Sequence, residues 1–164
     1  MSVQAEFLPI GPAEEAAILA LNNRHQRETS LLDAAKLRHL LGQSYLALRA
    51  GMDDALLIAF DESADYDSAN FIWFRERHKR FAYVDRIIVA EHARGRGLAR
   101  QFYEALFAKA ASDGHTMIAC EVNSDPPNPG SDAFHAALGF EEVGHAMIYG
   151  GERTVRYLVR RLAG

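Results

Sequence analysis

The sequence contains little cysteine and no long apolar run. Cys120 is the single cysteine among 164 residues, which excludes a disulfide framework and a thiolate metal cluster. No apolar stretch approaches the roughly 20 residues that a membrane-spanning helix needs. Residues 1–10 also lack the basic segment and apolar core of a secretion signal. We therefore expect a soluble cytoplasmic protein with no membrane partner.

An excess of positive charge is missing as well. The chain has 18 Lys and Arg against 22 Asp and Glu, a formal net charge of −4. General nucleic-acid binding depends on many cationic contacts to phosphates, so we expect no nucleic-acid partner. The seven histidines show no metal-ligand spacing, and we expect no metal. Hydrophobic residues at 49% and the chain length favour one globular domain over residues 1–164.

The order of predicted elements is that of a mixed α/β sheet. Periodicity and turn residues predict strands at 6–10, 45–49, 55–60, 71–74, 82–90, 116–122, 142–149 and 154–160, and helices at 14–25, 33–42, 97–112 and 131–138. The strand at 71–74 is inferred from four residues, three of them aromatic. A helix connects the strand at 82–90 to the next strand, as in a crossover connection.

The turn between that strand and that helix is basic and contains glycine. The first N–H groups of a helix have no internal partner, and the helix dipole attracts anions there. Gly95 and Gly97 would let the backbone approach a phosphate, and Arg94, Arg96 and Arg100 add positive charge. The pattern predicts a phosphate site, and a helix start with solvated arginines is the alternative. The turn has no lysine for a Walker loop, and an arginine stands where a dinucleotide fingerprint needs a small residue.

Two blocks resemble motifs of the GNAT superfamily of N-acyltransferases. Arg94-x-x-Gly97-x-Ala99, after the strand ending Ile87-Ile88-Val89, is similar to its pyrophosphate motif; Asn128-x-x-Ser131-x-x-Phe134-His135 with Leu138-Gly139-Phe140 is similar to its later motif. The resemblance covers about residues 81–162. It implies a GNAT-like acyl-CoA N-acyltransferase fold, with a central mixed, largely antiparallel sheet splayed open at the cofactor site and flanking helices.

The resemblance also implies a reaction. An acetyl group would move from acetyl-CoA to a primary amine of an unidentified acceptor, by direct attack of the amine on the thioester. The expected cofactor-binding residues come from the two blocks and the adjoining strands: Ile88, Val89, Arg94, Gly95, Arg96, Gly97, Leu98, Ala99, Asn123, Asn128, Ser131 and Phe134. The reaction requires no metal.

Amine attack needs a base, and the leaving thiolate needs an acid. Asp85 is the candidate base, and a salt bridge to Arg86 is an equally good explanation of its position. His135 stands where the family usually has a tyrosine acid. A structural or exposed histidine is the alternative, which would leave Tyr149, Tyr103 or water to protonate the thiolate.

Two other functions stay open at this point. The replaced tyrosine is compatible with a non-catalytic module that binds or senses acyl-CoA, and the anion loop with a nucleotide-binding regulator. The acceptor cannot be named, because acceptor choice depends on variable loops and not on the fold. An exposed sheet edge or the C-terminal hairpin could support a homodimer.

Overall fold

The computed structural model describes residues 4–25, 30–125, 127–148, 150–151 and 153–162. The strands of this part of the chain form one sheet in the order β1-β2-β3-β4-β5-β7-β6. They are β1 (Phe7–Pro9), β2 (Leu46–Ala50), β3 (Ala55–Asp61), β4 (Ala82–Val89), β5 (Met117–Asp125), β6 (Glu141–Ile148) and β7 (Arg153–Arg161). Strands β4 and β5 pair in parallel, and the other neighbours pair antiparallel. The mixed, largely antiparallel sheet is confirmed.

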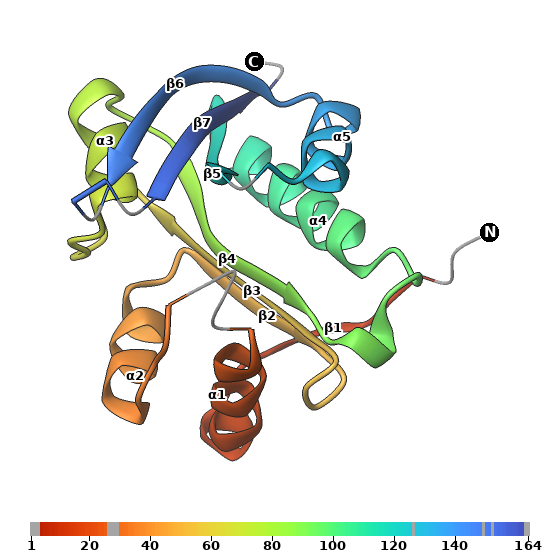
Figure 1. The fold of residues 1–164 in the computed structure, drawn as a ribbon. Coiled ribbons are helices and arrows are strands. Elements are labelled where there is room, and N and C mark those ends of the chain that lie inside the picture. The colour runs from red at the N-terminus through yellow and green to blue at the C-terminus, as the bar shows by residue number, and fades with distance from the viewer. Residues whose placement is uncertain (1–3, 26–29, 126, 149, 152, 163–164) are drawn as a thin grey trace.

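Helices cover both faces of this sheet. They are α1 (Glu15–Arg24), α2 (Ala34–Gln43), α3 (Ala69–Arg77), α4 (Leu98–Ser112) and α5 (Pro129–Ala137). Figure 1 shows α1 and α2 on one side of β2, β3 and β4, with α4 on the other. The Asp33 carboxylate accepts a hydrogen bond from the Lys36 N–H at 2.8 Å, so the predicted cap of the second helix is present.

The aromatic strand predicted at 71–74 is wrong, because these residues belong to α3. Phe71 and Phe74 are both fully buried, and their spacing of three residues places them on one helical face. Trp73 lies on a neighbouring face, where the Arg77 guanidinium stacks over its ring. The four-residue window was too short to distinguish a period of 2 from one of 3.6, and the helix continues to a basic last turn.

The defining feature of the sheet is the short contact between β4 and β5. The two strands pair only at Ala82↔Ile118 and Tyr83↔Ala119 in the part of the chain that the structure describes. The register of β3 against β4 then shifts, leaving Asp85 as the extra residue of a β-bulge. Beyond the bulge β4 keeps its pairing with β3 but not with β5, so the sheet opens there. The splayed sheet expected from the resemblance is confirmed.

Strand β6 approaches α3 closely at one glycine. A Cβ added to Gly144 would lie 2.5 Å from Cζ2 of Trp73. The Trp73 ring cannot easily move, because it stacks on Tyr157 with ring centroids 4.2 Å apart and contacts Phe74 edge-on. Gly144 therefore permits the packing of α3 against the C-terminal strands.

We predict that Gly144→Ala destabilises the protein by about 1–3 kcal/mol, because the added methyl group overpacks the Trp73 contact. The free energy of unfolding in urea measures the effect. Gly42→Ala is the matched control, since no atom lies within 4 Å of its added Cβ. Equal stability of the two variants would contradict this account of the α3–β6 contact.

Candidate active site

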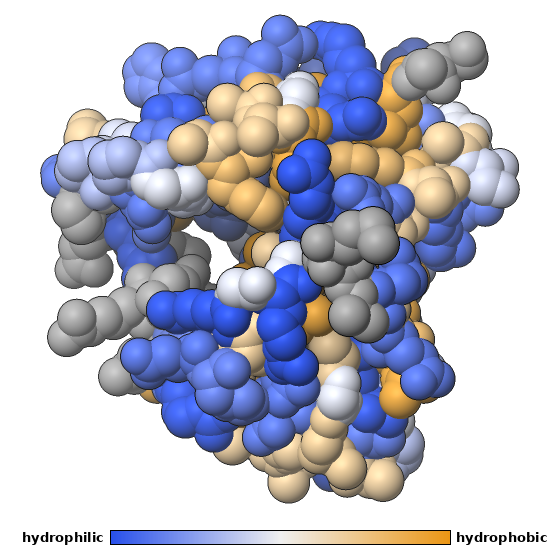
Figure 2. All heavy atoms as spheres, turned by 90° about the vertical axis from the view of Figure 1, so that its right-hand side faces the viewer, coloured by the Kyte–Doolittle hydropathy of each residue, from blue (hydrophilic) through white to orange (hydrophobic). Residues whose placement is uncertain are grey.

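The opening between β4 and β5 forms a cavity of about 540 Å³. Its walls come from β4 (residues 84–88) and β5 (120–123), with further side chains from α4, α5 and β7. Seen from the right-hand side of Figure 1, the surface is hollowed between its upper and lower parts, with hydrophobic residues above the hollow and hydrophilic ones below it (Figure 2). A cavity between separated strands can hold an extended ligand that contacts both.

The predicted phosphate loop lies at the far end of β4. Gly95 and Gly97 both have positive φ, at 84° and 72°, which favours glycine because it has no Cβ to clash. Gly97 is the N-cap of α4. None of the described residues accepts a hydrogen bond from the N–H groups of residues 95–99. A helix start whose N–H groups have no acceptor in the described part of the chain is the arrangement that binds a phosphate.

The three arginines of the loop differ in their contacts. Nη2 of Arg96 lies 2.9 Å from Oδ2 of Asp54, and Nε2 of His92 lies 2.8 Å from Oδ1 of the same carboxylate. The hydrogen bond from His92, and after it the one from Arg96, lowers the pKa of the Asp54 carboxyl. Arg100 contacts Glu104 at 3.4 Å. Arg94 is exposed and has no ion-pair partner among the described residues, so it is the loop arginine available to an anion.

The backbone of β4 adds further polar groups to the opening. The Ala90 N–H donates to the Asp54 carbonyl at 2.8 Å, and Val89 pairs with Ala55 in the next register position. Because antiparallel pairing alternates along a strand, the backbone groups of Val89 and Ile87 point away from β3, toward the opening. Those of Ile88 point to Leu56. The predicted backbone contact of Val89 is thus available. The predicted backbone contact of Ile88 is not, although Ile88 is among the residues that line the cavity.

Asp85 forms the salt bridge that was the alternative to a catalytic role. Its Oδ2 lies 2.8 Å from Nε of Arg86, and its Oδ1 accepts a hydrogen bond from the Tyr66 hydroxyl at 2.6 Å. Both side chains of the ion pair are buried. Arg86 also donates to the carboxamide oxygen of Asn22 at 2.7 Å, which ties α1 to β4. The two oxygens of Asp85 are engaged, so its observed contacts are structural.

His135 lies in the cavity wall with both ring nitrogens engaged. Nδ1 is 2.7 Å from the Ser131 carbonyl, and a carbonyl only accepts, so Nδ1 carries the proton. Nε2 is then the acceptor for the Tyr103 hydroxyl, at 3.3 Å. Burial lowers the pKa of His135 below its usual value of 6.5. The imidazole is therefore neutral near pH 7.

Glu121 is a cavity residue that sequence reasoning missed. It lies on β5, faces the cavity, and accepts a hydrogen bond from the Tyr83 hydroxyl at 2.6 Å. Burial, with a smaller contribution from the nearby Asp85 charge, raises the pKa of its carboxyl to about 8. A charged residue inside the otherwise apolar strand Met117–Val122 was the available signal, since an acid at such a position needs a partner or a function.

The other predicted residues differ in whether they reach the cavity. Asn123, Asn128 and Ser131 line the cavity, and Asn128 also caps α5 by accepting a hydrogen bond from the Ser131 N–H at 3.1 Å. Phe134 does not line the cavity, and its ring packs on Tyr103 with centroids 5.9 Å apart. Tyr149 lies outside the described residues. Leu98 is buried and Ala99 half-buried in the first turn of α4.

These features together define a class of protein. A sheet that opens beside a helix start with free N–H groups can hold a diphosphate at one end and an acyl-bearing arm in the opening. This is the arrangement of acyl-CoA-dependent N-acyltransferases, and the residues present fit acetyl-CoA.

Comparison with known proteins agrees. Residues 31–140 match the model of the acetyltransferase (GNAT) family. The chain is 29% identical over 124 residues to L-2,4-diaminobutyric acid acetyltransferase from Wolinella succinogenes, which spans 70% of this chain and 72% of that protein. The fold of the present chain is similar to that of the ribosomal-protein-S18-alanine N-acetyltransferase from Escherichia coli. The TM-score is 0.71 at 17% identity, and the match covers 97% of this chain and 94% of that one. The fold is also similar to that of Arabidopsis thaliana NAA60 in complex with acetyl-CoA, with TM-score 0.70, 14% identity and coverage of 97% and 99%.

The chain therefore belongs to the acetyltransferase (GNAT) family. It is an acyl-CoA-dependent N-acetyltransferase, and acetyl-CoA is its co-substrate. Among the described residues, no helix combines the length and apolar character that crossing a bilayer requires.

We predict that Ala99→Glu weakens CoA binding while the fold survives. A carboxylate in the first turn of α4 interacts well with the helix dipole but repels a diphosphate, and a loss of at least about tenfold in affinity is expected. Isothermal titration with CoA measures the loss. Ala111→Glu, at an exposed position near the other end of α4, is the control and should bind normally. Unchanged affinity of Ala99→Glu would remove the phosphate-loop assignment.

Proposed function

We propose that this enzyme acetylates a small amine that also carries a carboxylate, with Glu121 as the base. The observation behind the proposal is that one cavity contains a buried acid of raised pKa and an arginine, Arg153, at another part of its wall. An acid and a cation in one cavity complement a zwitterionic acceptor.

Glu121 is the better base because its carboxyl has no ion-pair partner among the described residues, whereas that of Asp85 pairs with Arg86. The Tyr83 hydroxyl donates to the Glu121 carboxyl at 2.6 Å, and Asn70 and the backbone add further hydrogen bonds that offset part of the rise that burial causes in its pKa. These partners are uncharged, whereas Asp85 is held by the Arg86 guanidinium. A base with a pKa near the operating pH is ionised often enough to accept a proton and still holds it well. We assign Glu121 to removing a proton from the acceptor amine, directly or through water, and Asp85 to holding Arg86 and Tyr66.

Acetyl-CoA supplies an activated thioester, and the chain positions it. The N–H groups of residues 95–99, with Arg94, hold the diphosphate, and the Val89 backbone orients the arm. The pair Tyr103 and His135 stands near the place of the family tyrosine. Because His135 is neutral, with its proton on Nδ1 facing Ser131, we propose that it orients the Tyr103 hydroxyl and that it is not itself the proton donor.

The acceptor class follows from charge. Arg153 lines the cavity and has no ion-pair partner among the described residues, so it is free to bind a carboxylate in a two-pronged manner. The relative from Wolinella succinogenes is named for a diaminocarboxylic acid, which has both an amine and a carboxylate. We propose an acceptor of that chemical class.

We further propose a cytoplasmic enzyme that forms a homodimer through a sheet edge. Strand β6 is at the edge of the sheet, and it exposes Met147 at 74% and Val143 at 37%. Apolar side chains on an open edge strand favour pairing with a second copy.

We predict that Glu121→Gln lowers kcat by about 10²-fold or more while the affinity for CoA stays within about twofold. In the wild type, kcat should rise with pH and level off above about pH 8, and the variant should lose this rise. Release of free thiol in the presence of L-2,4-diaminobutyrate measures both. Glu141→Gln, at an exposed position, is the control. A wild-type protein that binds acetyl-CoA but releases no thiol with any amine would instead favour the non-catalytic module.

Stability provides a second readout for the same variant. Because the folded protein holds the Glu121 proton up to about pH 8, and the unfolded chain releases it near 4.5, unfolding stability should fall as pH rises between these values, by about 1.4 kcal/mol per pH unit. Glu121→Gln should lack this decline. A wild-type stability that is flat between pH 5 and pH 8 would contradict the raised pKa.

We predict that Arg153→Gln raises KM for L-2,4-diaminobutyrate by about tenfold or more, which corresponds to the loss of a charged hydrogen bond. The KM for a diamine without a carboxylate should change little. Arg161→Gln is the matched control, since Arg161 lies on the same strand and faces Glu141 at 3.5 Å. If both acceptors respond equally to Arg153→Gln, the carboxylate is not recognised by this residue.

A further inference from the structure

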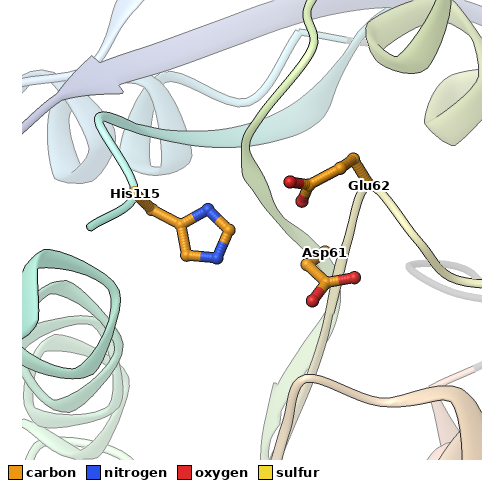
Figure 3. A group of neighbouring side chains, drawn as sticks. All are labelled: Asp61, Glu62 and His115. Carbon is orange, nitrogen blue, oxygen red and sulfur yellow. The ribbon is translucent and has the colours of Figure 1, made fainter. Parts of the chain in front are cut away.

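Three side chains outside the cavity gather at the other end of β4. Asp61 is the last residue of β3, Glu62 follows it, and His115 lies between α4 and β5. One ligand atom from each lies within 4.8 Å of the other two. Figure 3 shows the nitrogen-bearing edge of the imidazole facing the two carboxylates, which come from a segment far away in the sequence.

Two of these groups have buried atoms with no hydrogen-bond partner among the described residues. They are Nδ1 of His115 and Oε2 of Glu62. His115 is only 5% exposed, so water does not readily replace the missing partner. A buried polar atom without a partner costs about 1–3 kcal/mol, and two such atoms in one cluster indicate that something binds between them.

The surroundings orient the carboxylates and leave donor atoms free. Oδ1 of Asp61 accepts hydrogen bonds from the N–H of Ser63 at 2.9 Å and from its hydroxyl at 2.5 Å. Nε of Arg80 lies 3.9 Å from Oε1 of Glu62, the oxygen that is not orphaned. The ring of Tyr45 packs edge-on against the imidazole with centroids 5.1 Å apart. These contacts use Oδ1 of Asp61 and Oε1 of Glu62, so each carboxylate keeps its second oxygen for a ligand.

We propose that Asp61, Glu62 and His115 bind a divalent transition-metal ion, with zinc as the best match. Imidazole with carboxylates suits zinc, whereas magnesium and calcium prefer oxygen ligands alone. Donors to one zinc ion lie at most about 4.4 Å apart, so small side-chain rotations bring the three donors to bonding distance. Histidine spacing could not predict this site, because it contains one histidine and two acids from a distant turn.

The position of the cluster indicates a structural ion and not a catalytic one. Asp61 pairs with Ala82, and Ala82 pairs with Ile118, three residues after His115. The ion would therefore link β3 to the start of β5 at the closed end of the opening, where β4 and β5 share only two residue pairs. It would stabilise the join between the two parts of the sheet.

Metal binding can be tested on the full chain after treatment with EDTA and dialysis. Titration with Zn²⁺ should show one site per chain, and the melting temperature should rise by about 5 °C or more at a hundredfold excess over Kd. Mg²⁺ and Ca²⁺ should give no such rise. His115→Gln and Asp61→Asn should each lose at least about tenfold in zinc affinity. His145→Gln, which removes an exposed histidine on β6, is the matched control and should bind zinc as the wild type does.

Retained CoA binding by the variants shows that they are folded. Crystals grown with Zn²⁺ should give an anomalous peak between the three side chains. Wild-type protein that takes up no zinc, or variants that bind it as well as the wild type, would overturn the proposal. Zinc found only at surface histidines would do so too, and a proton or a water shared by these groups would then explain the cluster.

Discussion

The structure depends on where the backbone of β4 finds its hydrogen bonds. Up to Tyr83 it pairs with strands on both sides, and after the bulge at Asp85 it pairs only with β3. Backbone groups cannot remain buried without partners at low cost, so the open side of β4 has to face solvent or a ligand. The cavity and the accessible Val89 backbone both follow from this early end of the β4–β5 ladder.

Glu121 lines that opening, and its burial determines the pKa of its carboxyl. Burial of the Glu121 carboxyl opposes its ionisation, and the hydrogen bond from Tyr83 offsets this effect only in part. The same burial raises the pKa of the Glu121 carboxyl to about 8, a value that suits the role proposed for it as acceptor of a proton from an amine. Asp85 has the opposite environment, with Arg86 and Tyr66 occupying its oxygens. Two acids on neighbouring strands thus differ in chemistry because their partners differ.

Local sequence predicted the parts of this enzyme that depend on local structure. The cap at Asp33, the glycine turn and α4 each follow from residues close together in the chain, and each is present. The segment 71–74 was misread because its helical period appears only over nine residues. The salt bridge of Asp85 with the adjacent Arg86 was one of two local explanations, and only the fold decides between them. The neutral state of His135 and the hydrogen bond from Tyr83 to Glu121 depend on partners 32 and 38 residues away, which no local pattern identifies.

Two residue pairs between β4 and β5 also have a kinetic consequence. The half-sheet β1–β4 and the half-sheet β5-β7-β6 can change their mutual angle without breaking many hydrogen bonds, since only one end is joined. Residues of both strands line the cavity, so a coenzyme arm bound between them, as proposed above, would set that angle and with it the walls around the acceptor. In that arrangement the acceptor pocket would take its final shape only with the coenzyme in place, and the coenzyme would be the first substrate to bind.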